Sequence, residues 1–264
     1  MCNAMRRLMI LVWAATCFMS AAGCIKEDRN ECPCRLTLNL DGVWVEGKDS
    51  LELYVTSKDE TVYSVKLDSS DISSILMIDV PRTSLKLMAW CGKEGMARHS
   101  GLVIPLGKQC PKVYLYTADV DAQGETCCET VVMRKNHCVL SVLFKQDDAG
   151  DPILSLSGNV CGYDESGEPV VGDFYSEIIE DTAANVTCPQ VVVPRQCGGE
   201  MTLHVDDGAG KVRSFPLAEY IKSAGYDWSV PDLPDMIVTI DYVLTTLSLE
   251  VLGWDEEFFF NIVI

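Results

Sequence analysis

The sequence predicts an all-β protein with two tandem domains behind a cleaved signal peptide. Short alternating or β-branched segments, separated by turn residues, recur along the chain, and only one segment has helical spacing. The chain also starts with a short apolar run that ends at small residues. Short strands at regular spacing are typical of β-sandwiches.

The predicted strands fall into two sets, one on each side of residue 134. The first set comprises residues 35–40, 51–55, 61–67, 75–80, 85–90, 112–117 and 130–134. The second set comprises residues 138–144, 153–156, 190–193, 201–205, 212–215, 236–242, 247–251 and 257–263. Roughly seven strands on each side predict an N-terminal β-sandwich over residues 35–133 and a C-terminal one over residues 134–264. Frequent Gly, Asp and Glu at residues 158–172 predict a long loop in the second domain.

A single helix is predicted at residues 216–224. Proline is favoured at the start of a helix, and Pro216 opens this segment. Leu217 and Ile221 share one face, and Gly225 ends the helical pattern.

The first 23 residues have the pattern of a signal peptide. Arg6 and Arg7 precede an uncharged apolar run at residues 8–19. A helix of about 12 residues would be only about 18 Å long, which is too short for the ~30 Å hydrocarbon core of a membrane. The small residues at 20–23 lead to Cys24 and resemble the box at which bacterial lipoproteins are cleaved and acylated. We therefore predict a signal peptide over residues 1–23 and a lipid on Cys24.

Two other readings of this start remain open. The signal could be an ordinary cleaved one in which Cys24 is incidental, or the run could be an uncleaved anchor helix, which its length disfavours. Residues 24–34 then form a tether between lipid and fold. Its Lys26, Glu27 and Asp28 resemble a signal that exports lipoproteins to the outer face of the outer membrane, although charge runs are usually solvated linkers.

The charge balance argues against a nucleic acid partner. The chain carries 39 acidic and 21 basic residues, for a formal net charge of −18. Phosphates would be repelled by such a surface. The sequence also lacks a P-loop, a dinucleotide-binding glycine fingerprint, HExxH and GxSxG. We therefore predict neither an enzyme nor a cofactor.

The chain is rich in cysteine, with 13 in all. Cys2 and Cys17 would leave with the signal peptide, and Cys24 would be acylated. The remaining cysteines are Cys32, Cys34, Cys91, Cys110, Cys127, Cys128, Cys138, Cys161, Cys188 and Cys197. Their even number permits disulfides in an exported protein. Several lie within apolar strands, however, where a small buried hydrophobic role is favoured.

Several short motifs together resemble those of the FimB/Mfa-type fimbrial anchor lipoproteins. They are Cys24, Glu27-Asp28, Cys32-Pro33 before an alternating strand, and residues 87–92, 131–134, 138–143 and 249–254. The resemblance implies two transthyretin-like β-sandwich domains and a place at the cell surface, with the acylated Cys24 in the outer-membrane bilayer. Fimbrial subunits are the implied partners.

The resemblance also implies assembly by strand donation, in which one subunit supplies an extended strand to the sheet of another. The end of the chain is the candidate donor strand, with Phe258, Phe259, Phe260, Ile262, Val263 and Ile264. The alternative is that this segment is simply the last strand of its own sheet. An unpaired apolar edge would otherwise be prone to aggregation.

Other functions have weaker support in the sequence. A glycan- or protein-binding surface lipoprotein on the same fold is the main alternative, and a hydrolase ranks last because no nucleophile and base stand out. The best metal candidate combines Cys127, Cys128, His137 and Cys138. Adjacent residues of a strand face opposite sides, so we predict no metal site there. The tryptophans are expected in the core rather than on a sugar-binding surface, and only Trp44 and Trp228, near predicted turns, stay as minor candidates for a ligand contact.

Overall fold

The computed structural model describes residues 32–43, 50–58, 60–92, 97–98, 101–144, 153–180, 189–206, 211–241, 246–253 and 257–261. The predicted signal peptide, the predicted acylation site Cys24, residues 26–28 and the last three residues of the candidate donor strand lie outside these ranges. No helix in the described part of the chain is both long and apolar enough to cross a bilayer.

The N-terminal half forms two facing sheets. The smaller sheet has the order β4 (Ile75–Val80), β1 (Cys34–Asn39), β9 (Thr126–Thr130). The larger has the order β10 (Arg134–Lys135), β8 (Tyr114–Asp121), β5 (Ser84–Cys91), β2 (Ser50–Ser57), β3 (Glu60–Asp68). The central strand β1 runs antiparallel to β4 and parallel to β9. Alternate residues of β1 and β2 are buried, so their apolar side chains meet in one core between the sheets.

The C-terminal half is built on one large sheet of eleven strands. Its main path is β16 (Val212–Phe215), β15 (Thr202–Asp206), β12 (Ile153–Tyr163), β13 (Pro169–Glu180), β14 (Pro189–Pro194), β11 (His137–Phe144), β17 (Met236–Asp241), β18 (Thr246–Val251) and β19 (Glu257–Asn261). Of two further short strands, β7 (Gly101–Val103) pairs with β12, and β6 (Ala97–Arg98) pairs with β7. Strands from both ends of this path, and the helix α2 (Leu217–Ser223), contribute to a second core.

The predicted all-β class is confirmed, and α2 lies within the segment predicted to be helical. The long loop predicted at residues 158–172 is wrong. Most of that segment belongs to β12 and β13, which pair through two register shifts. Gly162 has a φ of +153°, and a Cβ there would meet the carbonyl oxygen of Leu102 at 2.0 Å. Glycine therefore permits β7 to approach β12 closely, and it does not mark a loop here.

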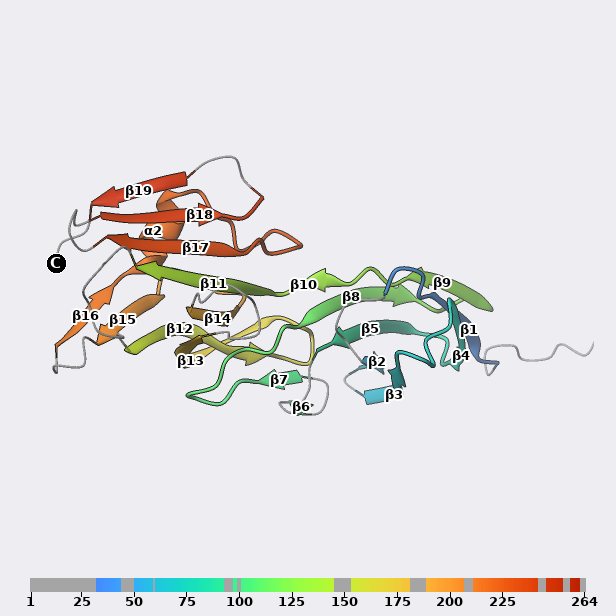
Figure 1. Ribbon diagram of the computed structural model, residues 1–264. Helices are drawn as coiled ribbons and strands as arrows, with labels where there is room; N and C mark the ends of the chain where they lie inside the picture. The colour runs from blue at the N-terminus through green and yellow to red at the C-terminus, as the bar shows by residue number, and fades with distance from the viewer. Residues whose placement is uncertain are drawn as a thin grey trace, which may run out of the picture.

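The two halves share residues at their junction. Met88, Trp90 and Leu115 belong to strands of the N-terminal half but pack in the core of the C-terminal half. Trp90 is fully buried and its ring meets that of Tyr163 edge to face, with centroids 5.9 Å apart. The sheet containing β1 lies at one end of an elongated molecule, and β17–β19 lie at the other (Figure 1). The division at residue 134 stays a prediction, since β7 and β10 each pair with strands of the opposite half.

We predict that Trp90→Ala lowers the free energy of unfolding by about 3–5 kcal/mol, because it removes a large buried ring and leaves a cavity. Chemical denaturation of the purified protein measures this change. Met77→Ala is the control, since that side chain is 63% exposed. A loss below about 1 kcal/mol for Trp90→Ala would show that the junction is not a packed core.

Candidate functional site

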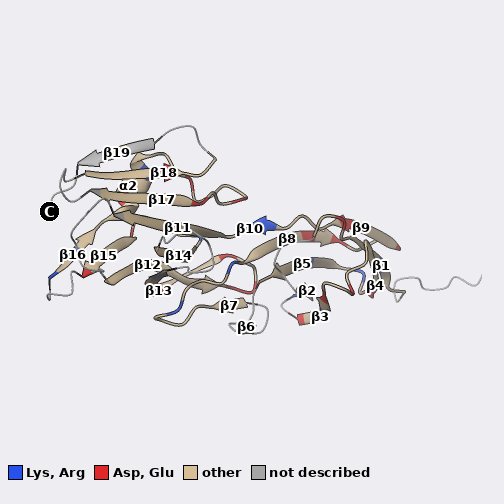
Figure 2. Ribbon diagram, viewed as in Figure 1, with Lys and Arg blue, Asp and Glu red and all other residues tan. Residues whose placement is uncertain are grey.

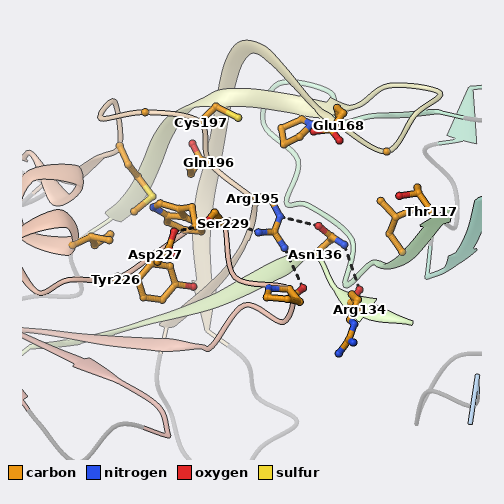
Figure 3. A pocket seen from close by; sticks show the side chains of 18 of the residues that line it. Thr117, Arg134, Asn136, Glu168, Arg195, Gln196, Cys197, Tyr226, Asp227 and Ser229 are labelled. Carbon is orange, nitrogen blue, oxygen red and sulfur yellow. Dashed lines mark hydrogen bonds between the residues drawn. The ribbon is translucent and has the colours of Figure 1, made fainter. Parts of the chain in front are cut away.

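A hollow with a volume of about 1020 Å³ lies at the junction of the two halves. Its walls come from β8, the chain at 130–136, the turn between β12 and β13, the segment that follows β14, α2 and the loop at 226–231. Figure 3 shows Arg195 between Asn136 on one side and the segment from Tyr226 to Ser229 on the other. The hollow is referred to below as the junction pocket.

Arg195 is the residue that fastens the walls of the junction pocket together. Its Nε donates to Oδ1 of Asn136 at 2.9 Å. Its Nη1 donates to the carbonyl oxygens of Trp228 and Val230, the latter at 2.8 Å, and its Nη2 donates to that of Pro231 at 3.2 Å. A guanidinium has five N–H donors, so these contacts leave one N–H of Nη2 for a ligand, counting only the described residues. Hydrogen bonds from a charged donor are stronger than neutral ones.

Tyr163 belongs to the same hydrogen-bond network as Arg195 and Asn136. Its hydroxyl donates to the carbonyl oxygen of Asn136 and accepts a hydrogen bond from the backbone N–H of Arg195 at 2.8 Å. Burial raises the pKa of Tyr163 well above its ordinary value, so the hydroxyl stays protonated and remains a donor. Tyr163 therefore contacts both the ring of Trp90 and the polar residues Asn136 and Arg195 of the pocket.

Two aspartates hold the segment after the 226–231 loop against β10. The carboxylate of Asp232 accepts hydrogen bonds from Nη1 of Arg134 at 2.9 Å and from the backbone N–H of Lys135 at 2.8 Å. Asp235 accepts from Nζ of Lys135 and from the backbone N–H of Val139, both at 2.6 Å. β10 is the basic strand at the centre of Figure 2. These contacts join residues that are far apart in the sequence, and they fix the loop to the start of the C-terminal half.

The junction pocket combines aromatic, cationic and anionic groups. The rings of Tyr226 and Trp228 pack edge to face, with centroids 4.8 Å apart. Asp227 is fully exposed, and hydrogen bonds from the side chain and backbone of Ser229 lower the pKa of its carboxyl group. Lys222 and Glu168 also line the walls. Such a mixture fits a polar ligand, such as a saccharide or an extended peptide, bound by hydrogen bonds and by an aromatic face.

A turn at the pocket rim joins the two halves. The carboxylate of Asp164 accepts hydrogen bonds from the backbone N–H groups of Ser166 at 2.6 Å and Glu168 at 3.0 Å. Gly167 has a φ of +81°, and a Cβ there would lie 2.5 Å from Cδ2 of Leu115 in β8. The positive φ favours glycine at this position, and its missing Cβ leaves room for the side chain of Leu115 from the N-terminal half.

The edge strand β19 is the second candidate site. It pairs antiparallel with β18, and it ends the described order of the large sheet. Phe259 on this strand is 69% exposed. An edge strand that carries a large exposed aromatic side chain is a surface on which another chain can add a strand.

The remaining candidates do not converge. Cys127 packs on the N-terminal core, whereas Cys138 is buried in the C-terminal one. His137 is buried, and its Nδ1 lies 2.9 Å from the carbonyl oxygen of Val113, which is the contact of a core histidine. No group of three metal-ligating residues was found among the described residues. Trp228 lines the junction pocket, and Trp44 lies outside the described ranges.

Sequence reasoning missed Arg195, Asn136 and Tyr163. Arg195 follows an apolar strand that ends in Pro194, and Asn136 precedes the apolar start of β11. A polar residue at the end of a buried strand is the only sequence signal for them, and it is weak. Their convergence depends on contacts between residues 27 and 59 positions apart in the chain.

Comparison with known proteins finds solved structures of the same fold. No protein-family profile matches the chain, and no curated protein matches it. The fimbrial anchor protein Mfa2 from Porphyromonas gingivalis superposes with a TM-score of 0.59 at 13% identity, over 84% of this chain and 98% of that one. This chain has an Mfa-type fold. The family resemblance suggested by its short motifs is thus confirmed for the fold.

Two proteins from Bacteroides thetaiotaomicron share the Mfa-type fold. One is a candidate polysaccharide-binding protein, with a TM-score of 0.58 at 14% identity over 87% of this chain and 98% of that one. The other is a candidate adhesin, with a TM-score of 0.57 at 14% identity over 88% of this chain and 99% of that one. These neighbours are not described as enzymes.

We predict that Arg195→Lys loosens the loop at 226–231, because one ammonium group cannot reach Asn136 and three backbone carbonyls together. The expected loss in the free energy of unfolding is about 2–3 kcal/mol, the range for hydrogen bonds to a charged group. Amide hydrogen exchange of this loop should accelerate.

The matched control is Arg35→Lys, since Arg35 forms an exposed ion pair with Asp79. Such pairs contribute about 0–1 kcal/mol. If both lysine variants had the same stability and the same exchange rates, Arg195 would not be the fastening residue of the junction pocket.

Proposed function

We propose that this chain is an outer-membrane lipoprotein that anchors or terminates a fimbria at the cell surface. The observation that carries the proposal is the fold shared with the fimbrial anchor Mfa2, which extends over 98% of that protein. The lipoprotein box at Cys24 supports it, because the acyl chains would hold the protein in the outer membrane. One acyl chain binds only marginally, whereas two or more hold a protein stably.

The arrangement of the molecule suits this role. β1 follows the predicted tether and lies at one end of the molecule, whereas β19 lies at the other (Figure 1). A subunit built in this way would place its lipid at one pole and a free sheet edge at the opposite pole. Lys26, Glu27 and Asp28 would direct the lipoprotein to the outer face of the membrane.

The fimbrial partner would bind through a strand. In this proposal, the segment from Phe258 to Ile264 either stays on β18 and accepts a neighbouring strand at its open edge, or leaves β18 and enters the sheet of a neighbour. Main-chain hydrogen bonds supply affinity in both cases, and side-chain pockets supply specificity. The acidic surface is consistent with a protein partner and disfavours nucleic acid.

A specific observation favours a second function. The junction pocket carries the Tyr226–Trp228 pair, and one N–H of Arg195 has no acceptor among the described residues, which would suit a surface glycan-binding lipoprotein. Calorimetric binding of oligosaccharides that disappears in Trp228→Ala would favour this alternative. No heat of binding over a broad oligosaccharide set would remove its support.

We predict that Cys24→Ala releases the protein from membranes into the soluble fraction, since acylation at this residue supplies the anchor. Cys32→Ala is the control, because Cys32 is exposed and lies outside the box. Immunoblots of pelleted membranes measure the distribution. Continued pelleting of Cys24→Ala would contradict the lipid anchor.

The anchoring function has its own test in the native bacterium. Deleting the gene should shift fimbriae from the cells to the culture medium, and expressing the Cys24→Ala variant should not restore them to the cells. Fimbriae retained on cells at the wild-type level after deletion would sink the anchor proposal.

A further inference from the structure

Two thiols face each other where the chain enters its first strand. Sγ of Cys34 in β1 lies 3.5 Å from Sγ of Cys127 in β9. The two strands are parallel neighbours, and Leu36 pairs with Cys127, so both cysteines lie near the same end of the sheet. Both also pack on the core of the N-terminal half, Cys34 with no exposed surface and Cys127 half-buried.

Other cysteines in the described residues have different surroundings. Sγ of Cys110 donates to the carbonyl oxygen of Pro111. Sγ of Cys161 lies 3.7 Å from the carbonyl oxygen of Val170. Their sulfur atoms face backbone oxygen, whereas Cys34 and Cys127 offer each other a second sulfur atom.

We propose that Cys34 and Cys127 are a redox site that closes into an intramolecular disulfide when the protein folds outside the cytoplasm. A disulfide needs a sulfur–sulfur distance of ~2.05 Å, so the two sulfurs must approach by about 1.5 Å. Because Cys127 pairs with Leu36, two residues beyond Cys34, closing this gap takes side-chain rotation together with a small shift of the strand ends. An exported protein meets the oxidising conditions in which such bonds persist.

The bond forms by exchange with an external disulfide. The Cys127 thiolate attacks that disulfide, which gives a mixed disulfide and releases one thiolate. The Cys34 thiolate then attacks Sγ of Cys127, forms the Sγ–Sγ bond and releases the second thiolate. The two protons lost by the cysteines pass to the two released thiolates, and the external disulfide takes up the two electrons.

The bond would form during folding and not afterwards. Burial, followed by the hydrogen bond to Cys34, raises the pKa of the Cys127 thiol to about 12. The folded thiol is therefore a poor nucleophile near neutral pH. Before β9 pairs with β1, the Cys127 thiol is exposed to water and keeps the ordinary pKa and reactivity of a free thiol.

The disulfide would close a loop between residues 93 positions apart. It would tie the strand that follows the tether directly to β9, at the end of β1 from which the tether leaves. If the chain is an anchor, as proposed above, tension between the fimbria and the lipid leaves the fold at this point. The existence of the bond does not depend on that function.

The test uses the full-length protein purified from membranes. Free thiols are blocked with N-ethylmaleimide in denaturant, with and without prior reduction, and the intact mass is measured. Wild type should take up two more labels after reduction. A peptic digest without reduction should contain a peptide that links Cys34 to Cys127. The thermal midpoint should be roughly 5–15 °C higher in the oxidised than in the reduced protein, as expected for a loop of this size.

Variants assign the pair. Cys34→Ala and Cys127→Ala should each abolish the two-label difference, and Cys161→Ala should preserve it. The proposal is overturned if wild type shows no difference even after refolding with oxidised glutathione. It is equally overturned if the peptic map links other cysteines, a result that does not require the variants to fold.

The outcomes separate the bond from the proposed function. A linked Cys34–Cys127 peptide in a protein whose loss leaves fimbriae on cells would contradict only the anchor role. Free thiols in a protein that does retain fimbriae would contradict only the disulfide.

Discussion

Tyr163 makes the contact that couples the packing of the two halves to the polar network at their junction. Its ring packs against the fully buried Trp90, while its hydroxyl bonds to Asn136 and to the backbone N–H of Arg195. Arg195 then carries the network to the loop at 226–231. An apolar contact and a polar network thus share one side chain, so neither half can shift without breaking both.

This constraint explains why the junction holds both a core and a hollow. Trp90 is fully buried beside the ring of Tyr163, whereas Arg195, which bonds to the same side chain, lines the junction pocket. The carboxylates of Asp232 and Asp235 fix the other end of the loop on β10. These contacts join the two halves of an elongated molecule that has β1 at one end (Figure 1).

Sequence patterns predicted the strands and the helix better than the tertiary contacts between them. The alternation in β1, β2 and β11 was readable because one face of each strand is buried. The second half of β12 and all of β13 were missed because Gly158, Gly162 and neighbouring acidic residues have the composition of a loop. In the fold, those glycines let other segments approach closely. Composition cannot distinguish a glycine that permits a turn from one that permits a close contact.

The candidate sites divide in the same way. Cys24 and the apolar end of the chain were visible because each is a local pattern. The junction pocket was not, because its polar residues come from segments that only the topology brings together. The facing thiols of Cys34 and Cys127 were also invisible, since parallel pairing of β1 with a strand 93 positions away places them in contact.

We propose that this protein joins the membrane at its β1 end to a fimbrial neighbour at β19. A photoreactive benzoylphenylalanine at Phe259, irradiated in fimbriated cells, tests this directly. We expect a covalent adduct with a fimbrial subunit. The adduct should be absent when the same group replaces Val171, which is 72% exposed on β13. Equal adducts at both positions, or none at either, would contradict it.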